Sequence, residues 1–156
     1  MGRQRPPLIL LTRIGRLDLI ERLAPTILVP RAVIEEVRDG EEKDSTAATA
    51  LEWAEPYGVP NIAVPAGVEH WDLGSGESQV IAHAIGGSRW AVLDDLAARR
   101  CAAAHGVPVI GTLGVVLRSK ERGLLHEARP TVRSLIDAGM FANEELVDRA
   151  LKSVGE

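Results

Sequence analysis

Short apolar runs alternate with longer amphipathic segments along the chain, a pattern typical of strands that alternate with helices. Leu8, Ile9, Leu11 and Ile14 recur at helical spacing, and Gly15 separates this short helix from a second one that Pro25 ends. Buried strands are predicted over residues 27–29, 61–64, 90–93 and 107–110. Further helices are predicted over residues 30–38, 47–53, 77–85, 96–105, 111–122, 130–138 and 143–154, with a charged loop over 40–46.

This alternation predicts parallel βαβ units, and hence an α/β fold in which a central parallel sheet lies between helices as a three-layer sandwich. The length of 156 residues suits one domain with a sizeable core, and no repeat or low-complexity tract interrupts the pattern. We therefore expect a single domain over residues 1–156. Its last two helices, within residues 126–156, are expected to pack on the same core as an appendage.

Composition excludes several classes of protein. A hydrophobic fraction of 46% and a net charge of −4 exclude a disordered chain and a nucleic-acid binder held by bulk positive charge. The single cysteine, Cys101, excludes an intramolecular disulfide and a Cys-rich zinc site, and it fits a reducing cytoplasm. No apolar run reaches the ~20 residues that span a membrane, so no membrane association is expected.

Acidic residues follow two of the predicted strands and a glycine-rich loop. Asp94 and Asp95 come directly after residues 90–93, Glu36 lies with Glu35 on the helix after residues 27–29, and Glu77 opens a helix. Ligand sites in parallel sheets lie beyond the carboxyl ends of the strands, so these acids are expected to converge. Clustered carboxylates repel one another without a cation, and oxygen ligands favour Mg²⁺ or Mn²⁺. Such a site suits metal-assisted phosphodiester hydrolysis.

Each acid also has an ordinary structural explanation. Glu35 and Glu36 fit a solvated helix face, and Glu77 fits the favourable end of a helix dipole. One of Asp94 and Asp95 can cap the helix that follows, although two adjacent acids exceed what a cap needs.

Three other features have both a functional and a structural interpretation. Gly74-Ser75-Gly76 could cradle a phosphate, but it lacks a Walker lysine and fits better a turn in which Ser75 caps a helix. The histidines show no zinc spacing, and Cys101 fits a core position. Five basic residues could contact phosphates, with ordinary surface charge as the default: Arg99, Arg100, Arg118, Lys120 and Arg122.

Five segments, taken together and in order, resemble PIN-domain proteins of the subgroup found in bacterial and archaeal toxin–antitoxin loci. They are residues 8–19, 29–37, 73–82, 93–99 and 106–114, and the similarity runs from about residue 7 to 125. The resemblance implies a parallel sheet flanked by helices and an endoribonuclease that depends on Mg²⁺ or Mn²⁺. It implies Glu36, Glu77 and Asp95 as metal ligands, with Asp94 as a further catalytic acid. The usual partner in this family is a small antitoxin protein that blocks the site, and homodimers are common.

The N-terminus departs from the family pattern. The family opens with an apolar strand that ends in an aspartate, whereas residues 1–6 here are polar and Gln4 or a neighbour stands at the position of that aspartate. Three interpretations remain open: the start codon is misassigned, the protein is an inactive relative, or the polar N-terminus fills the slot with a weakened site. Gln79 is a smaller departure, because many relatives have a second acid near that position.

The sequence thus leads to one main functional hypothesis and two alternatives. The main one is a cytoplasmic PIN-like ribonuclease, the toxin of a toxin–antitoxin pair, which hydrolyses RNA with metal-activated water. The first alternative is a catalytically impaired or truncated PIN-like protein that only binds protein or RNA. The second is an α/β phosphate-binding module that uses Gly74 and Gly76.

Overall fold

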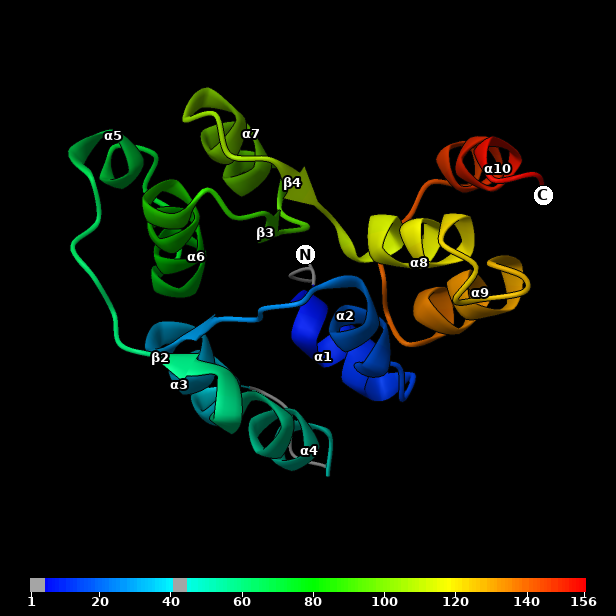
Figure 1. Ribbon diagram of the computed structural model, residues 1–156, viewed down its shortest axis with the longest axis horizontal. Helices are drawn as coiled ribbons and strands as arrows, with labels where there is room; N and C mark the ends of the chain where they lie inside the picture. The colour runs from blue at the N-terminus through cyan, green and yellow to red at the C-terminus, as the bar shows by residue number, and fades with distance from the viewer. Residues whose placement is uncertain (1–4, 41–44) are drawn as a thin grey trace. The chain divides into compact units, whose positions relative to one another are not determined.

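The computed structural model describes residues 5–40 and 45–156, which form an α/β protein (Figure 1). The chain divides into two compact units. The central unit is Ile27–Ile110, and the terminal unit combines the chain up to Thr26 with Gly111–Glu156. Within the described residues, no helix is both long and apolar enough to cross a membrane.

The central unit contains two parallel pairs of short strands. Strand β1 (Val29–Pro30) pairs with β2 (Gly58–Val59), and β3 (Ala91–Val92) pairs with β4 (Val109–Ile110). The helices of this unit are α3 (Arg31–Asp39), α4 (Ser45–Ala54), the 3-10 turn η1 (Glu55–Tyr57), α5 (Ala66–Glu69), α6 (Ser75–Gly87) and α7 (Leu96–Ala104). Helix α6 packs against α3 and against both β1 and β3, so it is the element that the two strand pairs share (Figure 1).

These observations confirm the α/β class with parallel strands. The predicted single central sheet does not appear among residues 5–40 and 45–156, where two separate pairs stand in its place. The resemblance implies a further, central strand at the start of the chain, and Gln4 or a neighbour, predicted to stand in place of its aspartate, lies at or next to the residues outside the described ranges. The charged loop predicted over residues 40–46 falls largely at 41–44, which also lie outside them.

The strand predicted over residues 61–64 is wrong, and β2 at Gly58–Val59 takes its place. The backbone of this segment bonds to side chains instead of to a neighbouring strand. The side-chain amide of Gln79 accepts from Ile62 N and donates to Ile62 O, both at 2.8 Å. Asn61 turns its side chain to α3, where Oδ1 accepts from Ala32 N at 2.9 Å. Apolar periodicity carries no information about such bonds.

Small apolar side chains make up the core of the central unit around α6, β3 and α7. Alanines of α7 let this helix pack closely on Leu93 and Ile81, and Cys101 is fully buried among them, as predicted. Burial raises the pKa of the Cys101 thiol, which keeps it protonated and unreactive.

The terminal unit is helical in its described part. It contains α1 (Pro7–Arg13), α2 (Asp18–Leu23), α8 (Thr112–Glu121), α9 (Arg129–Asp137) and α10 (Glu144–Ser153). Helices α1, α2 and α9 all pack against α8. Gly15 adopts a φ of +68° at the turn between α1 and α2, the left-handed conformation that favours glycine, as its predicted place at a helix break requires.

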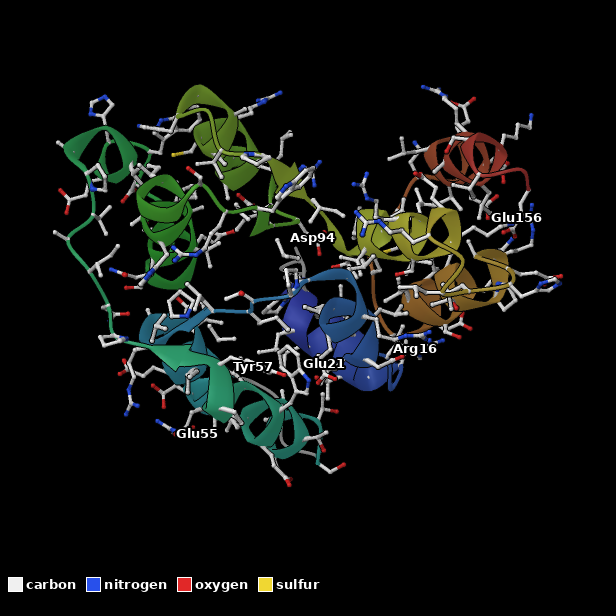
Figure 2. All side chains as sticks on the ribbon, viewed as in Figure 1. Arg16, Glu21, Glu55, Tyr57, Asp94 and Glu156 are labelled. Carbon is white, nitrogen blue, oxygen red and sulfur yellow. The ribbon has the colours of Figure 1, made fainter. Side chains whose placement is uncertain are left out.

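The final residue joins two helices of this unit. The carboxylate of Glu156, labelled in Figure 2, accepts from Lys120 Nζ at 2.7 Å, from Ala128 N at 2.6 Å and from Arg129 N at 3.0 Å. The Lys120 hydrogen bond, with the two backbone amides, lowers the pKa of Glu156 to about 2. Glu156 therefore fixes the start of α9 against α8 in its ionised form.

Candidate active site

Glu36 and Glu35 are neighbours on α3 with different surroundings. Ala32, Ile34 and Val37 bury one face of this helix, which leaves both glutamates on its polar side. Glu35 forms an exposed ion pair with Arg31, at 3.4 Å between Nε and Oε1, so the solvated helix face is its role. Glu36 instead reaches the start of α6, where its Oε1 accepts a hydrogen bond from Gly76 N at 2.8 Å.

The approach of Glu36 to α6 depends on the absence of a side chain at Gly76. A Cβ atom at this position would lie 2.5 Å from Glu36 Oε2 and 3.0 Å from Glu36 Cδ, closer than side chains pack. Gly76 is buried and has no positive φ, so a side chain here would displace the Glu36 carboxylate rather than strain the backbone.

The prediction that Ser75 caps α6 is wrong. Ser75 is the first helical residue, Gly74 occupies the capping position, and no side chain caps the helix locally. Glu36, forty positions earlier in the sequence, accepts the Gly76 amide that a local cap would bind. Glu36 also uses the amide that a phosphate cradle over Gly74 and Gly76 would offer, which argues against the phosphate-binding alternative.

Glu77 lies at the same glycine turn. Its Oε1 and Glu36 Oε1 are 3.7 Å and 3.8 Å from the position of a Cβ on Gly74. Since each oxygen lies within 4 Å of one point, the two are less than 8 Å apart. The structure therefore brings two of the predicted acids to the same glycine turn.

Asp94 and Asp95 lie where β3 ends and α7 begins, and Figure 2 labels Asp94 there. Asp95 is the N-cap of α7, with Oδ2 accepting from Ala98 N at 3.0 Å, which confirms that one of the pair caps this helix. Asp94 is half-buried. Over residues 5–40 and 45–156, no three His, Cys, Asp or Glu side chains gather in a way that could hold a metal ion. Glu36, Glu77 and Asp95 thus do not form one ligand group in this structure.

A divalent cation is compatible with the pair that does form. Mg²⁺ commonly binds through one or two carboxylates, keeps several waters and takes further oxygens from a substrate phosphate. Glu36 and Glu77 supply two hard oxygen donors beside the Gly74–Gly76 turn. A Cβ on Gly76 would displace the Glu36 carboxylate. The donor chemistry suits Mg²⁺ or Mn²⁺, which prefer oxygen ligands.

The structure also gives roles to residues that the sequence left unexplained. Gln79 is buried, and its amide both accepts from and donates to the Ile62 backbone, which a carboxylate could not do. Arg99 donates from Nη1 to Leu93 O at 3.0 Å, which distinguishes it from the other basic residues. The sequence could have indicated this position of Arg99 through its spacing of four residues from Asp95. Side chains four residues apart in a helix lie on the same face and lean towards the helix N-terminus.

The central unit thus belongs to the α/β proteins that carry acids where parallel strands end and helices begin, a class that includes metal-dependent hydrolases of phosphate esters. A sequence model of the PIN-domain family matches residues 6–156, and the chain belongs to that family. PIN domains are generally nucleases. No curated protein and no solved structure matches the chain. The resemblance to PIN domains is confirmed, and the toxin–antitoxin subgroup stays a prediction.

Proposed function

We propose that this protein is a metal-dependent ribonuclease that hydrolyses RNA phosphodiester bonds. The observation that carries the proposal is the convergence of Glu36 and Glu77 on the Gly74–Gly76 turn, in a chain of the PIN-domain family. Two carboxylates at one turn repel each other, and a cation between them relieves that repulsion.

Each acid has a part in this proposal. Glu36 and Glu77 would hold Mg²⁺ or Mn²⁺, Asp95 would be the third ligand, and Asp94 would assist as a catalytic acid. A bound metal would supply an activated water and neutralise charge that develops on the phosphate. Glu36 keeps its carboxylate at the turn through the Gly76 amide, and Asp95 keeps its own at the end of β3 through Ala98.

The family resemblance extends the proposal to the cellular role. We propose that the chain is the toxin of a toxin–antitoxin pair, acts in the cytoplasm and is blocked by a small antitoxin protein. A homodimer is part of the same proposal. The buried, unpaired Cys101 is consistent with a reducing compartment.

The test is cleavage of single-stranded RNA with Mn²⁺ or Mg²⁺, and again after chelation. We expect cleavage that needs the metal and that falls by two or more orders of magnitude in Glu36→Gln and Glu77→Gln. Glu35→Gln is the matched control, since Glu35 is the exposed neighbour on α3 and should leave cleavage unchanged. Cleavage that persists in Glu36→Gln and Glu77→Gln would overturn the assignment.

A second candidate function is a PIN-like module that binds protein or RNA without turnover. Two points favour it: no three His, Cys, Asp or Glu side chains that could hold a metal ion gather within the described residues, and the resemblance places Gln4 or a neighbour where an aspartate is expected. RNA binding with no cleavage at any metal concentration would establish it over the nuclease.

A further inference from the structure

The five basic residues that the sequence grouped together differ in their surroundings. Lys120 bonds to Glu156, and three others are exposed: Arg100, Arg118 and Arg122. Arg99 is half-buried, and it alone among the five is bonded to the end of a strand. Its Nη1 donates to Leu93 O at 3.0 Å.

That bond fixes the guanidinium beside the acids. The Leu93 carbonyl belongs to the peptide that joins Leu93 to Asp94, directly after β3. Arg99 lies four residues after Asp95 in α7, and helical side chains lean towards the N-terminus of their helix. The charge of Arg99 is therefore held at the strand end from which Asp94 and Asp95 extend.

A single hydrogen bond between α7 and the end of β3 uses only part of the hydrogen-bonding capacity of Arg99. The Leu93 carbonyl takes one of the five N–H donors of the Arg99 guanidinium. Within the described residues, this carbonyl is the acceptor to which Arg99 donates. Any side chain with a single donor could supply that bond. An arginine adds a planar fork of further donors and a permanent charge, the features that suit paired oxygens of a phosphate.

Because the chain has a net negative charge, RNA binding at the end of β3 needs a positively charged side chain nearby. At −4 the protein as a whole repels RNA, and two adjacent acids add to that repulsion where the strand ends. A phosphate can approach these acids only with positive charge close by, and Arg99 provides it on a rigid element.

We propose that Arg99 binds a phosphate of the RNA backbone next to Asp94 and Asp95 and so positions the strand for cleavage. This inference rests on the proposed ribonuclease function and concerns substrate positioning rather than chemistry. Its partner is the phosphodiester backbone, so recognition through Arg99 is independent of base sequence.

The experiment measures binding of a labelled single-stranded RNA in chelator, where cleavage is absent, over a series of salt concentrations. Arg99→Gln removes the charge together with the bond from Nη1 to Leu93 O, and Arg99→Lys keeps the charge without the fork. We expect the slope of log Kd against log salt to fall by about 0.7 in Arg99→Gln, the value of one phosphate contact on a single strand. Arg99→Lys should keep most of the slope and bind several-fold more weakly.

Arg100→Gln is the matched control, because Arg100 is the exposed neighbour on the same helix and should leave the slope unchanged. A thermal melt of each variant separates loss of folding from loss of binding. An unchanged slope in Arg99→Gln, an equal fall in Arg100→Gln, or no RNA binding by the wild type overturns the inference. The cleavage assay with Mn²⁺ tests the acids independently, so RNA binding through Arg99 without cleavage would refute the nuclease and the positioning role, and would leave only the phosphate contact of Arg99.

Discussion

Gly76→Ala tests the contact on which the candidate site depends. The new Cβ would lie 2.5 Å from Glu36 Oε2, so the carboxylate must move and give up its 2.8 Å hydrogen bond to the backbone of residue 76. Loss of a helix N-cap costs about 0.5–2 kcal/mol, and we take ~1 kcal/mol because the Glu36 side chain is exposed. Alanine in place of glycine in a helix returns about 0.5–1 kcal/mol. The two effects nearly cancel, and we expect little change in stability without metal.

Gly86→Ala is the matched control in the same helix, because nothing lies within 4 Å of a Cβ at Gly86. It receives the propensity gain without the clash, so it should be more stable than Gly76→Ala by about 1 kcal/mol. A chain of this size shifts its melting temperature by roughly 2–4 °C per kcal/mol, which a thermal melt resolves.

Added Mn²⁺ separates the two variants further. A ligand at 100 times its Kd stabilises by about 2.7 kcal/mol, a gain that wild type and Gly86→Ala should show and Gly76→Ala should lose. Glu36→Ala removes the clash, so in that background Gly76→Ala should behave like Gly86→Ala. If Gly76→Ala matches Gly86→Ala in wild type, with and without Mn²⁺, then Glu36 does not hold the position described and the reasoning fails.

Three other predictions concern single residues. Glu156 has a pKa of about 2 in the folded protein, below the 4.5 of an unperturbed glutamate, so its stabilising effect is complete above pH 4.5 and is lost as the pH falls through about 2. Glu156→Gln should flatten the acid limb of a pH series of melts, and an unchanged limb would contradict this. Gln79→Leu leaves both Ile62 backbone groups without their partners and should cost about 1–3 kcal/mol in denaturant unfolding. A loss of less than half a kcal/mol, roughly the effect of a surface substitution, would count against it. Asp95→Asn keeps a good N-cap and should match wild type in a metal-free melt, whereas Asp95→Ala should lose about 1 kcal/mol. If Asp95→Asn still gains stability from Mn²⁺ as wild type does, Asp95 is not a ligand.

Much of the fold could be predicted from patterns that act over a few neighbouring residues. Helix periodicity located the longer described helices to within a few residues but missed the four-residue α5 at Ala66–Glu69. Gly15 and Asp95 were found through turn and cap preferences that act over a few positions. The apolar runs before Pro30 and around Ala91 located β1 and β3 for the same reason.

The failures have a common physical cause, which is that a distant side chain replaces a local partner. Residues 61–64 have the composition of a strand, but Gln79 takes the backbone bonds that a neighbouring strand would take. Serine is a preferred helix-capping residue, so Ser75 was predicted to cap α6. Glu36, forty positions earlier in the sequence, accepts the Gly76 amide instead. The role of Gly76 follows from the same contact and cannot be seen without it.

The bond between Glu36 and Gly76 also has a consequence for folding. The first turn of α6 has no cap within its own sequence, so an isolated peptide of this helix would fray at its start. The turn becomes protected only after α3 has docked and closed a loop of forty residues. The beginning of α6 is therefore expected to form late and to open together with α3, and slow amide exchange at Gly76 would report that the two helices are assembled.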